Sequence, residues 1–188
     1  RELERRPKAN TRGLITDVGN DILYGFPPEQ ILTWVKEAAS RLLFHTTDVV
    51  LTDLPRASIR RLSPRAFLFF RTLFFPPCRL SRDEVFERVD RVNEGLAGIA
   101  ASMGLRLVHL EEDWYSFDPI HIRPRAWSVA WRKILAGEEV PGDAAAFSSL
   151  ELAHLHLLSP ERRFLLGLER VTPQTGRNLR RGGCLWIY

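Results

Sequence analysis

The sequence predicts an α/β domain in which helices cover both faces of a parallel sheet. Short apolar or β-branched runs alternate along the chain with longer segments whose apolar residues recur at helical spacing. Gly, Pro, Asn or Asp bound most of these runs and favour breaks in regular structure. Strands that alternate with amphipathic helices are typical of parallel sheets, because each helix returns the chain to the start of the next strand.

The expected strands are residues 13–18, 48–54 and 105–110. Gly19-Asn20-Asp21 breaks the first strand, and Pro55 stops the second, which has a β-branched centre. Sheets of this kind place their functional loops at the carboxyl ends of the strands. Polar residues that directly follow a strand are therefore the first candidates for a site.

The expected helices have recognisable starts. Ser81 and Glu84 form an S-x-x-E capping box, and Gly104 supplies a left-handed stop for the helix that follows them. Proline suits a first helical turn. The other helices are expected after Pro27-Pro28, from Ser63-Pro64 to Pro76-Pro77, and from Pro124 to Ala136.

Two regions are expected along the chain. Residues 1–136 form the α/β domain, and residues 137–188 form a linker and a C-terminal extension. The linker is Gly137 to Gly142, and the extension is predicted to be helical at residues 147–158 and 160–170. Its last residues are rich in Gly and Arg.

Composition narrows the class of protein. With 188 residues, 45% of them hydrophobic, the chain can bury one sizeable core, and no apolar run reaches the roughly 20 residues of a membrane span. Two distant cysteines, Cys78 and Cys184, form no disulfide framework and no C-x-x-C pair, which favours a reducing compartment such as the cytoplasm. The first residue is Arg, so we expect the natural start to be missing.

The basic charge is almost entirely arginine. The formal net charge is +4, and arginine pairs occur at 60/61, 162/163 and 180/181. The pattern fits a solvated surface, or a patch for an anionic partner. We do not expect nucleic acid as a partner, because no RNP, helix-turn-helix or zinc-finger signature is present.

Asp118-Pro119-Ile120-His121 lies in the loop after the third expected strand. A carboxylate three residues before a histidine can accept from one imidazole nitrogen and leave the other as a general base. Gly19-Asn20-Asp21 follows the first strand, where the Asn20 amide can face a developing oxyanion. The alternative for each motif is a plain loop turn.

Together, and in this order, the two motifs resemble the fifth and third conserved blocks of the SGNH hydrolases, also called the GDSL family. The resemblance covers residues 13–135. It implies a three-layer, flavodoxin-like fold without its N-terminal strand, and hydrolysis of small-molecule carboxylic esters by a Ser-His-Asp mechanism, with no metal or cofactor. It makes His121 the general base, Asp118 its orienting carboxylate, and Asn20 with Gly19 the oxyanion hole.

The chain departs from this family in two places. Val18 stands where the family usually has Gly. No Gly-Asp-Ser occurs, so the nucleophilic serine is expected upstream of Arg1, and this chain alone is expected to turn over little substrate. Ser116 has no strained turn to present it to His121, and Cys184 is interpreted as an ordinary thiol.

Other functions stay open at this stage. One is a non-catalytic α/β binding module whose Arg-rich tail binds an anionic partner, and another is a nucleic-acid binder that uses the arginines of the extension. These arginines are Arg162, Arg163, Arg177, Arg180 and Arg181. The oligomeric state is not evident from the sequence.

The remaining aromatic and histidine residues allow two readings. Five phenylalanines gather between Arg65 and Arg79, either as a buried helix face with a packed loop or as a hydrophobic wall for an acyl chain. They are Phe67, Phe69, Phe70, Phe74 and Phe75. His154 and His156 do not share a helix face, so no metal site is expected, and His45 and His109 are interpreted as structural.

Overall fold

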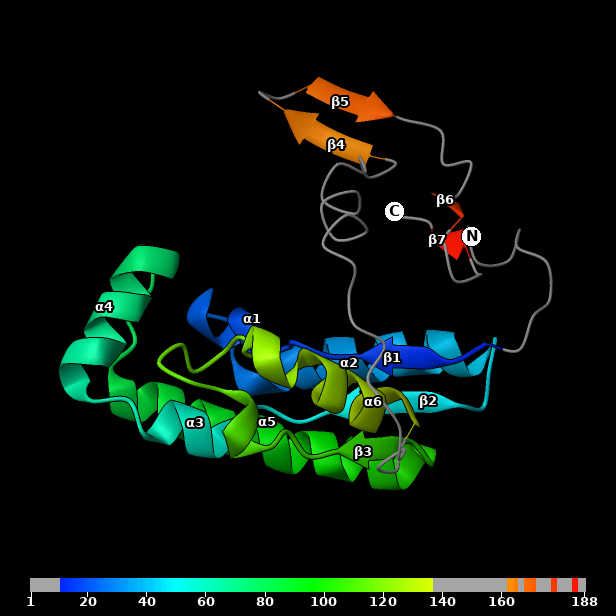
Figure 1. Ribbon diagram of the computed structural model, residues 1–188, viewed down its shortest axis with the longest axis horizontal. Helices are drawn as coiled ribbons and strands as arrows, with labels where there is room; N and C mark the ends of the chain where they lie inside the picture. Colours follow the sequence, from blue (N-terminus) through cyan, green and yellow to red (C-terminus); the bar gives the residue numbers. More distant parts are fainter. Residues whose placement is uncertain (1–10, 137–161, 166–167, 172–176, 179–183, 186–188) are drawn as a thin grey trace. The chain divides into compact units, whose positions relative to one another are not determined.

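The structure is a computed structural model that describes residues 11–136, 162–165, 168–171, 177–178 and 184–185 (Figure 1). The chain divides into two compact units, Arg1–Gly142 and Asp143–Tyr188. Each unit is described by itself below.

The first unit is built on a small parallel sheet. Strands β1 (Gly13–Ile15), β2 (Val49–Thr52) and β3 (Arg106–Val108) lie in the order β1-β2-β3. The register pairs Leu14 with Val50 and Leu51 with Leu107. The predicted α/β class, with a parallel sheet flanked by helices, is therefore confirmed.

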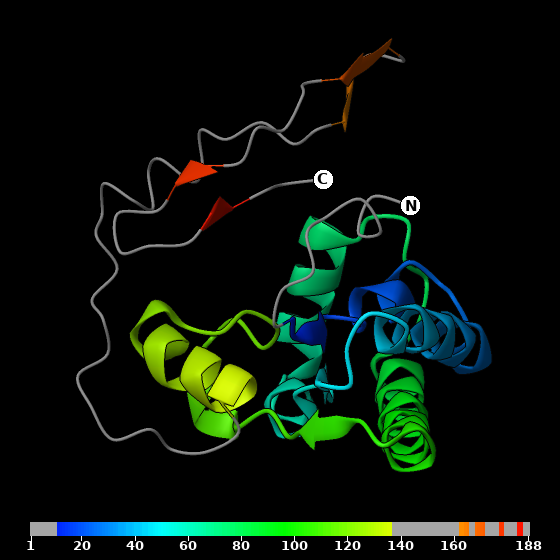
Figure 2. The ribbon, with the colours of Figure 1, turned by 90° about the vertical axis from the view of Figure 1, so that its right-hand side faces the viewer.

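Helices cover both faces of this sheet. Figure 2 shows α2 (Pro28–Leu43) and α5 (Arg82–Met103) on one side and α6 (Trp127–Ala136) on the other. Successive side chains of a strand point to opposite faces. Accordingly Val49 and Leu51 belong to the core beneath α2 and α5, and Val50 belongs to the core beneath α6. All four residues of β2 are buried, as expected for a strand covered on both faces.

The predicted helix signals act locally as expected. Ser81 and Glu84 form both hydrogen bonds of the capping box, and Gly104 ends α5 in the left-handed region with φ 67°. Ser63 accepts a hydrogen bond from the Ala66 amide and caps α4 (Pro64–Phe74). Gly95 allows α5 to approach α2 closely, because a Cβ there would lie 2.2 Å from the Leu32 side chain.

Short elements were not predicted. Helix α3 (Arg56–Arg60) follows Pro55, and Ser58 is buried inside it. Residues expected to form a simple break after β1 begin the one-turn helix α1 (Asn20–Leu23). The last helix begins as the 3-10 turn η3 (Pro124–Ala126) before it continues as α6.

The predicted helix at residues 160–170 is wrong. Strands β4 (Arg162–Leu165) and β5 (Leu168–Val171) pair antiparallel, and β6 (Arg177–Asn178) pairs with β7 (Cys184–Leu185). Leu165 pairs with Leu168, so two residues, the second of them Gly167, separate the partners. This spacing is typical of hairpins, and the apolar run was too short to distinguish a helix from a strand by periodicity.

Other expectations for the extension, namely the linker at 137–142 and the helix at 147–158, lie outside the described residues. Among the described residues, no helix has the length and apolar character needed to cross a membrane.

Candidate active site

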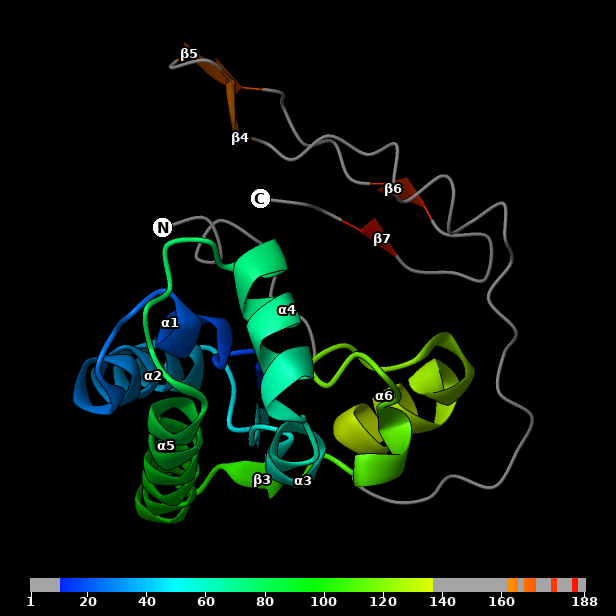
Figure 3. The ribbon, with the colours of Figure 1, turned by 90° about the vertical axis from the view of Figure 1, so that its left-hand side faces the viewer.

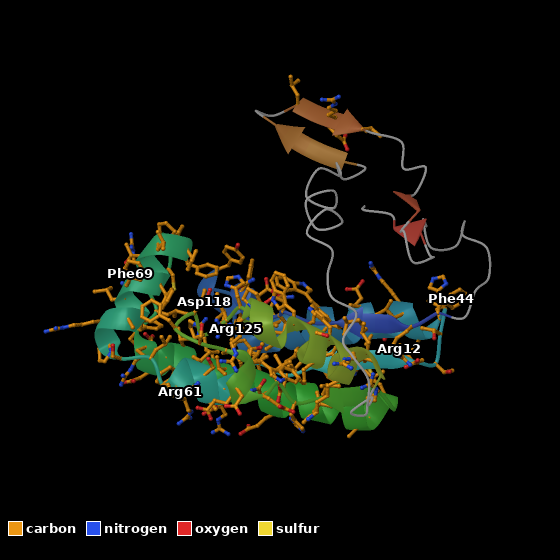
Figure 4. All side chains as sticks on the ribbon, in the orientation of Figure 1. Arg12, Phe44, Arg61, Phe69, Asp118 and Arg125 are labelled. Atoms are coloured by element: carbon orange, nitrogen blue, oxygen red, sulfur yellow. The ribbon has the colours of Figure 1, made fainter. Side chains whose placement is uncertain are left out.

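Polar side chains gather where the three strands of the first unit end. Thr16 and Asp17 follow β1, Asp53 follows β2, and His109 follows β3. Figure 4 shows Asp118 toward this end of the domain, away from Arg12 and Phe44 at the other end. The carboxyl edge of the sheet therefore collects the titratable groups that the sequence placed in separate loops.

Asp118 and His121 form the hydrogen bond that their spacing predicts. His121 Nδ1 lies 2.6 Å from Asp118 Oδ2. The other oxygen, Oδ1, accepts from the backbone amides of Ile120 at 3.0 Å and His121 at 3.2 Å. A carboxylate at Nδ1 favours the neutral tautomer with its proton on that nitrogen, which leaves Nε2 as the basic position. The His121 side chain is 67% exposed, so this nitrogen is accessible to a reactant.

The loop that carries this pair is fixed at its base. Trp114 is buried, and its carbonyl accepts from the Arg123 amide at 2.8 Å. The Trp127 indole N–H, from the start of α6, donates to the Ile122 carbonyl at 2.6 Å. These contacts hold both ends of the loop against the sheet, so the position of His121 is set by the fold.

Asn20 and Asp17 occupy the loop after β1. Asp17 has φ 62°, in the left-handed region that few residues other than Gly adopt but that Asp tolerates. The Asn20 amide donates to Asp17 Oδ2 at 3.4 Å. Gly19 caps α1 and packs against Leu54, where a Cβ would lie 3.2 Å from the leucine side chain. Asn20 is thus turned toward Asp17, and one of its two amide hydrogens serves that contact.

The loops of Asn20 and His121 come within electrostatic range of each other. Partial burial raises the pKa of Asp17, the charge of His121 lowers it, and Asp21 raises it again. The charge of His121 therefore acts on Asp17, three residues before Asn20, although nearly a hundred residues separate the two motifs in the sequence.

A second Asp/His pair was missed by the sequence analysis. His109 Nδ1 lies 2.7 Å from Asp53 Oδ2, and Asp53 Oδ1 accepts from the Leu110 amide at 2.7 Å. His109 was interpreted as a lone structural histidine, yet its side chain is 78% exposed and paired. The sequence carries no direct signal for this pair, because only the register of Thr52 with Val108 places the residues that follow the two strands side by side.

Tyr115 is buried near the loops that carry Asp17 and Asp53. Burial raises the pKa of its phenol strongly, and the charges of Asp53 and Asp17 raise it further. The hydroxyls of Thr16 and Thr52 lie 2.9 Å apart at the same edge. The two Asp/His pairs are therefore accompanied at this edge by a neutral phenol and by two hydroxyl groups, with Thr52 buried and Thr16 exposed.

Other candidates from the sequence are placed as follows. Ser116 is exposed and lines a hollow at the foot of α4. Cys184 lies in β7, where only the backbone is described, and His154 and His156 lie outside the described residues. Within the described part of the chain, no three His, Cys, Asp or Glu side chains gather as ligands for a metal ion.

The arginine pair at 60/61 is engaged by acidic side chains. Arg60 binds Asp90, and Arg61 lies 2.8 Å from Glu112. These ion pairs reduce the positive charge that this part of the surface offers to an anionic partner. Arg180 and Arg181 lie outside the described residues, as do the side chains of Arg162 and Arg163.

No protein-family model, curated protein or solved structure matches this chain. A functional assignment therefore depends on what the site can do. A histidine held by a carboxylate can move a proton, and an amide nearby can bind a developing negative charge. This combination suits acyl transfer, provided that a nucleophile is present.

Proposed function

We propose that this chain is part of a serine ester hydrolase of the SGNH, or GDSL, type that acts on carboxylic esters. The observation that supports this most strongly is the Asp118/His121 pair, in which the carboxylate binds His121 Nδ1 at 2.6 Å and is itself held by two backbone amides. Such a carboxylate fixes the tautomer of the base and stabilises the imidazolium that forms during acyl transfer.

The reaction assigns one task to each residue. A serine supplied by a segment preceding Arg1 attacks the ester carbonyl, and His121 Nε2 takes its proton. An Asn20 amide hydrogen, with Gly19 shaping the turn, stabilises the oxyanion of the tetrahedral intermediate. As the intermediate collapses, His121 returns the proton to the leaving alcohol. Water then attacks the acyl group on the serine, and His121 takes a proton from this water. His121 returns the proton to the serine oxygen, which releases the carboxylic acid and the free serine.

The fold is consistent with this proposal. The helix-flanked parallel sheet would be part of a three-layer, flavodoxin-like sheet, with the strand before the nucleophile beside β1. That arrangement would bring the serine to the same carboxyl edge as Asn20 and His121, as parallel sheets place their functional loops at this edge.

The test is fluorophosphonate labelling of the full-length gene product, with mass spectrometry to locate the adduct. We expect one labelled serine upstream of Arg1 and at least a hundredfold slower labelling in His121→Ala, because the serine is then no longer activated. His109→Ala is the matched control and should label at nearly the normal rate. A folded protein that takes no label would overturn the proposal and favour a non-catalytic α/β binding module.

A further inference from the structure

Helix α4 exposes an unusual amount of apolar surface. Phe69 and Phe74 are 55% and 46% exposed, and Leu68 and Leu73 are more than half exposed, while Phe67 and Phe75 are buried. Figure 3, which views the carboxyl ends of the strands, shows α4 standing in front of the sheet between α1 and α6. Neighbouring exposed apolar side chains of this size are uncommon on soluble domains and mark a binding surface.

One face of α4 is directed at the candidate active site. Ala66, Phe70 and Phe74 recur every four residues and share that face. The rings of Phe70 and Phe74 stack with centroids 6.0 Å apart, and Phe70 contacts Phe117 at 5.2 Å. At the end of the row, the Phe74 ring lies 6.3 Å from the imidazole of His121. The row of aromatic rings therefore ends at the proposed general base.

A hollow continues this row along the foot of α4. Its volume is about 290 Å³; Leu62, Ala66, Phe117 and Pro119 supply the apolar part of its lining, and Arg61 with three serines supplies the polar part. Phe117 belongs both to the row of rings and to the hollow. From Phe74 to Ala66 the helix axis advances about 12 Å, at roughly 1.5 Å per residue, which suits a hydrocarbon chain of medium length.

The charged side chain on α4 nearest this face is turned elsewhere. Arg71 donates to the Leu80 carbonyl at 2.9 Å, and its guanidinium lies over the ring of buried Phe67. The face built from Ala66, Phe70 and Phe74 is thus apolar. An uncharged hydrocarbon chain suits such a face, because burying it costs no hydration of polar or charged groups.

We infer that this face of α4, together with Phe117, binds the acyl chain of the substrate and selects medium-chain esters. The inference rests on the proposed ester hydrolase function and adds the class of acyl group. The carbonyl would lie at His121, and the chain would run past Phe74 and Phe70 into the hollow beside Ala66. Leu68 lies on the opposite side of α4 and takes no part.

The test compares p-nitrophenyl acetate, butyrate and octanoate as substrates of the full-length gene product. In the wild type, kcat/KM should rise about fourfold for each methylene that becomes buried. Phe70→Ala and Phe74→Ala should lower kcat/KM for the octanoate at least tenfold, and for the acetate less than threefold. Leu68→Ala is the matched control and should follow the wild-type profile.

Three results would overturn the inference: equal losses on acetate and octanoate, a flat chain-length profile in the wild type, or a Leu68→Ala profile like that of Phe74→Ala. The last would indicate a lipid surface or a protein partner on α4. Circular dichroism of each variant checks that α4 is folded, and Phe117→Ala gives an independent substitution outside the helix.

Binding of free octanoate, followed by NMR, separates this inference from the proposed function. Octanoate that perturbs Ala66 and Phe117, also in His121→Ala but not in Phe70→Ala, would support the chain-binding face even if no serine took a label. If the serine is labelled and esters are hydrolysed but octanoate does not bind, the proposed ester hydrolase function stands and the proposed acyl-chain site is wrong.

Discussion

The two Asp/His pairs of this domain contain the same kind of hydrogen bond, from histidine Nδ1 to a carboxylate oxygen, and differ in almost everything around it. His121 and Asp118 lie three residues apart in a single loop, whereas His109 and Asp53 are 56 residues apart and follow neighbouring strands. The Nδ1 to Oδ2 distances are 2.6 Å and 2.7 Å. An Asp/His contact is therefore not by itself a sign of catalysis, and the surroundings must decide.

The surroundings assign different tasks to the two pairs. Asp53 joins two strand ends, since its amide donates to the Val108 carbonyl at 3.2 Å and its carboxylate accepts from the Leu110 amide. Its side chain is only 16% exposed. The Asp118/His121 pair lies beside an aromatic wall and within electrostatic range of the Asn20 loop. The first pair holds the sheet edge together, and the second is the pair to which we assign the chemistry.

The largest expected effect is on turnover. His121→Ala in the full-length gene product should lower kcat for ester hydrolysis about 10⁴-fold, because removal of the base leaves only binding and oxyanion stabilisation. His109→Ala should lower kcat less than tenfold. Steady-state kinetics on p-nitrophenyl butyrate measure both. If His109→Ala is the more damaging change, the roles of the two pairs are reversed.

The next effect concerns the oxyanion. Asn20→Ala should lower kcat about 10²- to 10³-fold, as loss of one oxyanion donor does, with little change in KM. Asp21→Asn, in the same helix α1, is the control and should change kcat less than threefold. A rise in KM with an unchanged kcat would mean that Asn20 contributes to substrate binding and not to the transition state.

A smaller effect concerns stability. Asp53→Ala should reduce the free energy of unfolding by about 2 kcal/mol, because it leaves the Leu110 amide without its partner at a half-buried position. Asp118→Ala breaks contacts within one loop and should cost about 1 kcal/mol. Urea unfolding of both variants measures the difference. Equal costs would contradict the view that Asp53 has the structural task.

The contrast between the pairs also explains what the sequence could predict. The spacing of Asp118 and His121 is visible within four residues, so their contact could be proposed directly. Asp53 and His109 meet only through the register of β2 with β3, and neither neighbouring sequence indicates the other. The strands, the long helices and their caps were predictable because periodicity and capping act locally.

The failures follow from the same cause. Helix α3 has five residues, too few for an apolar period to show. The apolar run at 162–171 fits a helix or a hairpin equally well, and only strand pairing distinguishes them. The exposure of Phe69 and Phe74 was undecidable in advance, because it depends on how far α4 stands from the sheet.

The smallest expected effect is the pH-dependent contribution of Asp17 to stability. Asp17 is protonated at higher pH in the folded than in the unfolded chain, because partial burial raises its pKa. The folded state binds more protons in the window above about pH 4, so the contribution of Asp17 to stability is present at low pH and lost as the pH rises. Asp17→Asn should therefore match the wild type at acidic pH and exceed its stability at neutral pH. The gain should stay below about 0.5 kcal/mol, because the Asp17 side chain also keeps contact with solvent, which screens its charge.

The same carboxyl group can report on the two pairs by NMR titration. Protonated His121 lowers the pKa of Asp17, so His121→Ala should raise that pKa further, and His109→Ala should leave it in place. The measurement needs no catalysis and no nucleophile. A pKa of Asp17 that responds to His109→Ala and ignores His121→Ala would place the Asn20 loop beside the wrong histidine. The oxyanion donor and the general base would then belong to separate parts of the sheet edge, and the proposed active site would lose its geometry.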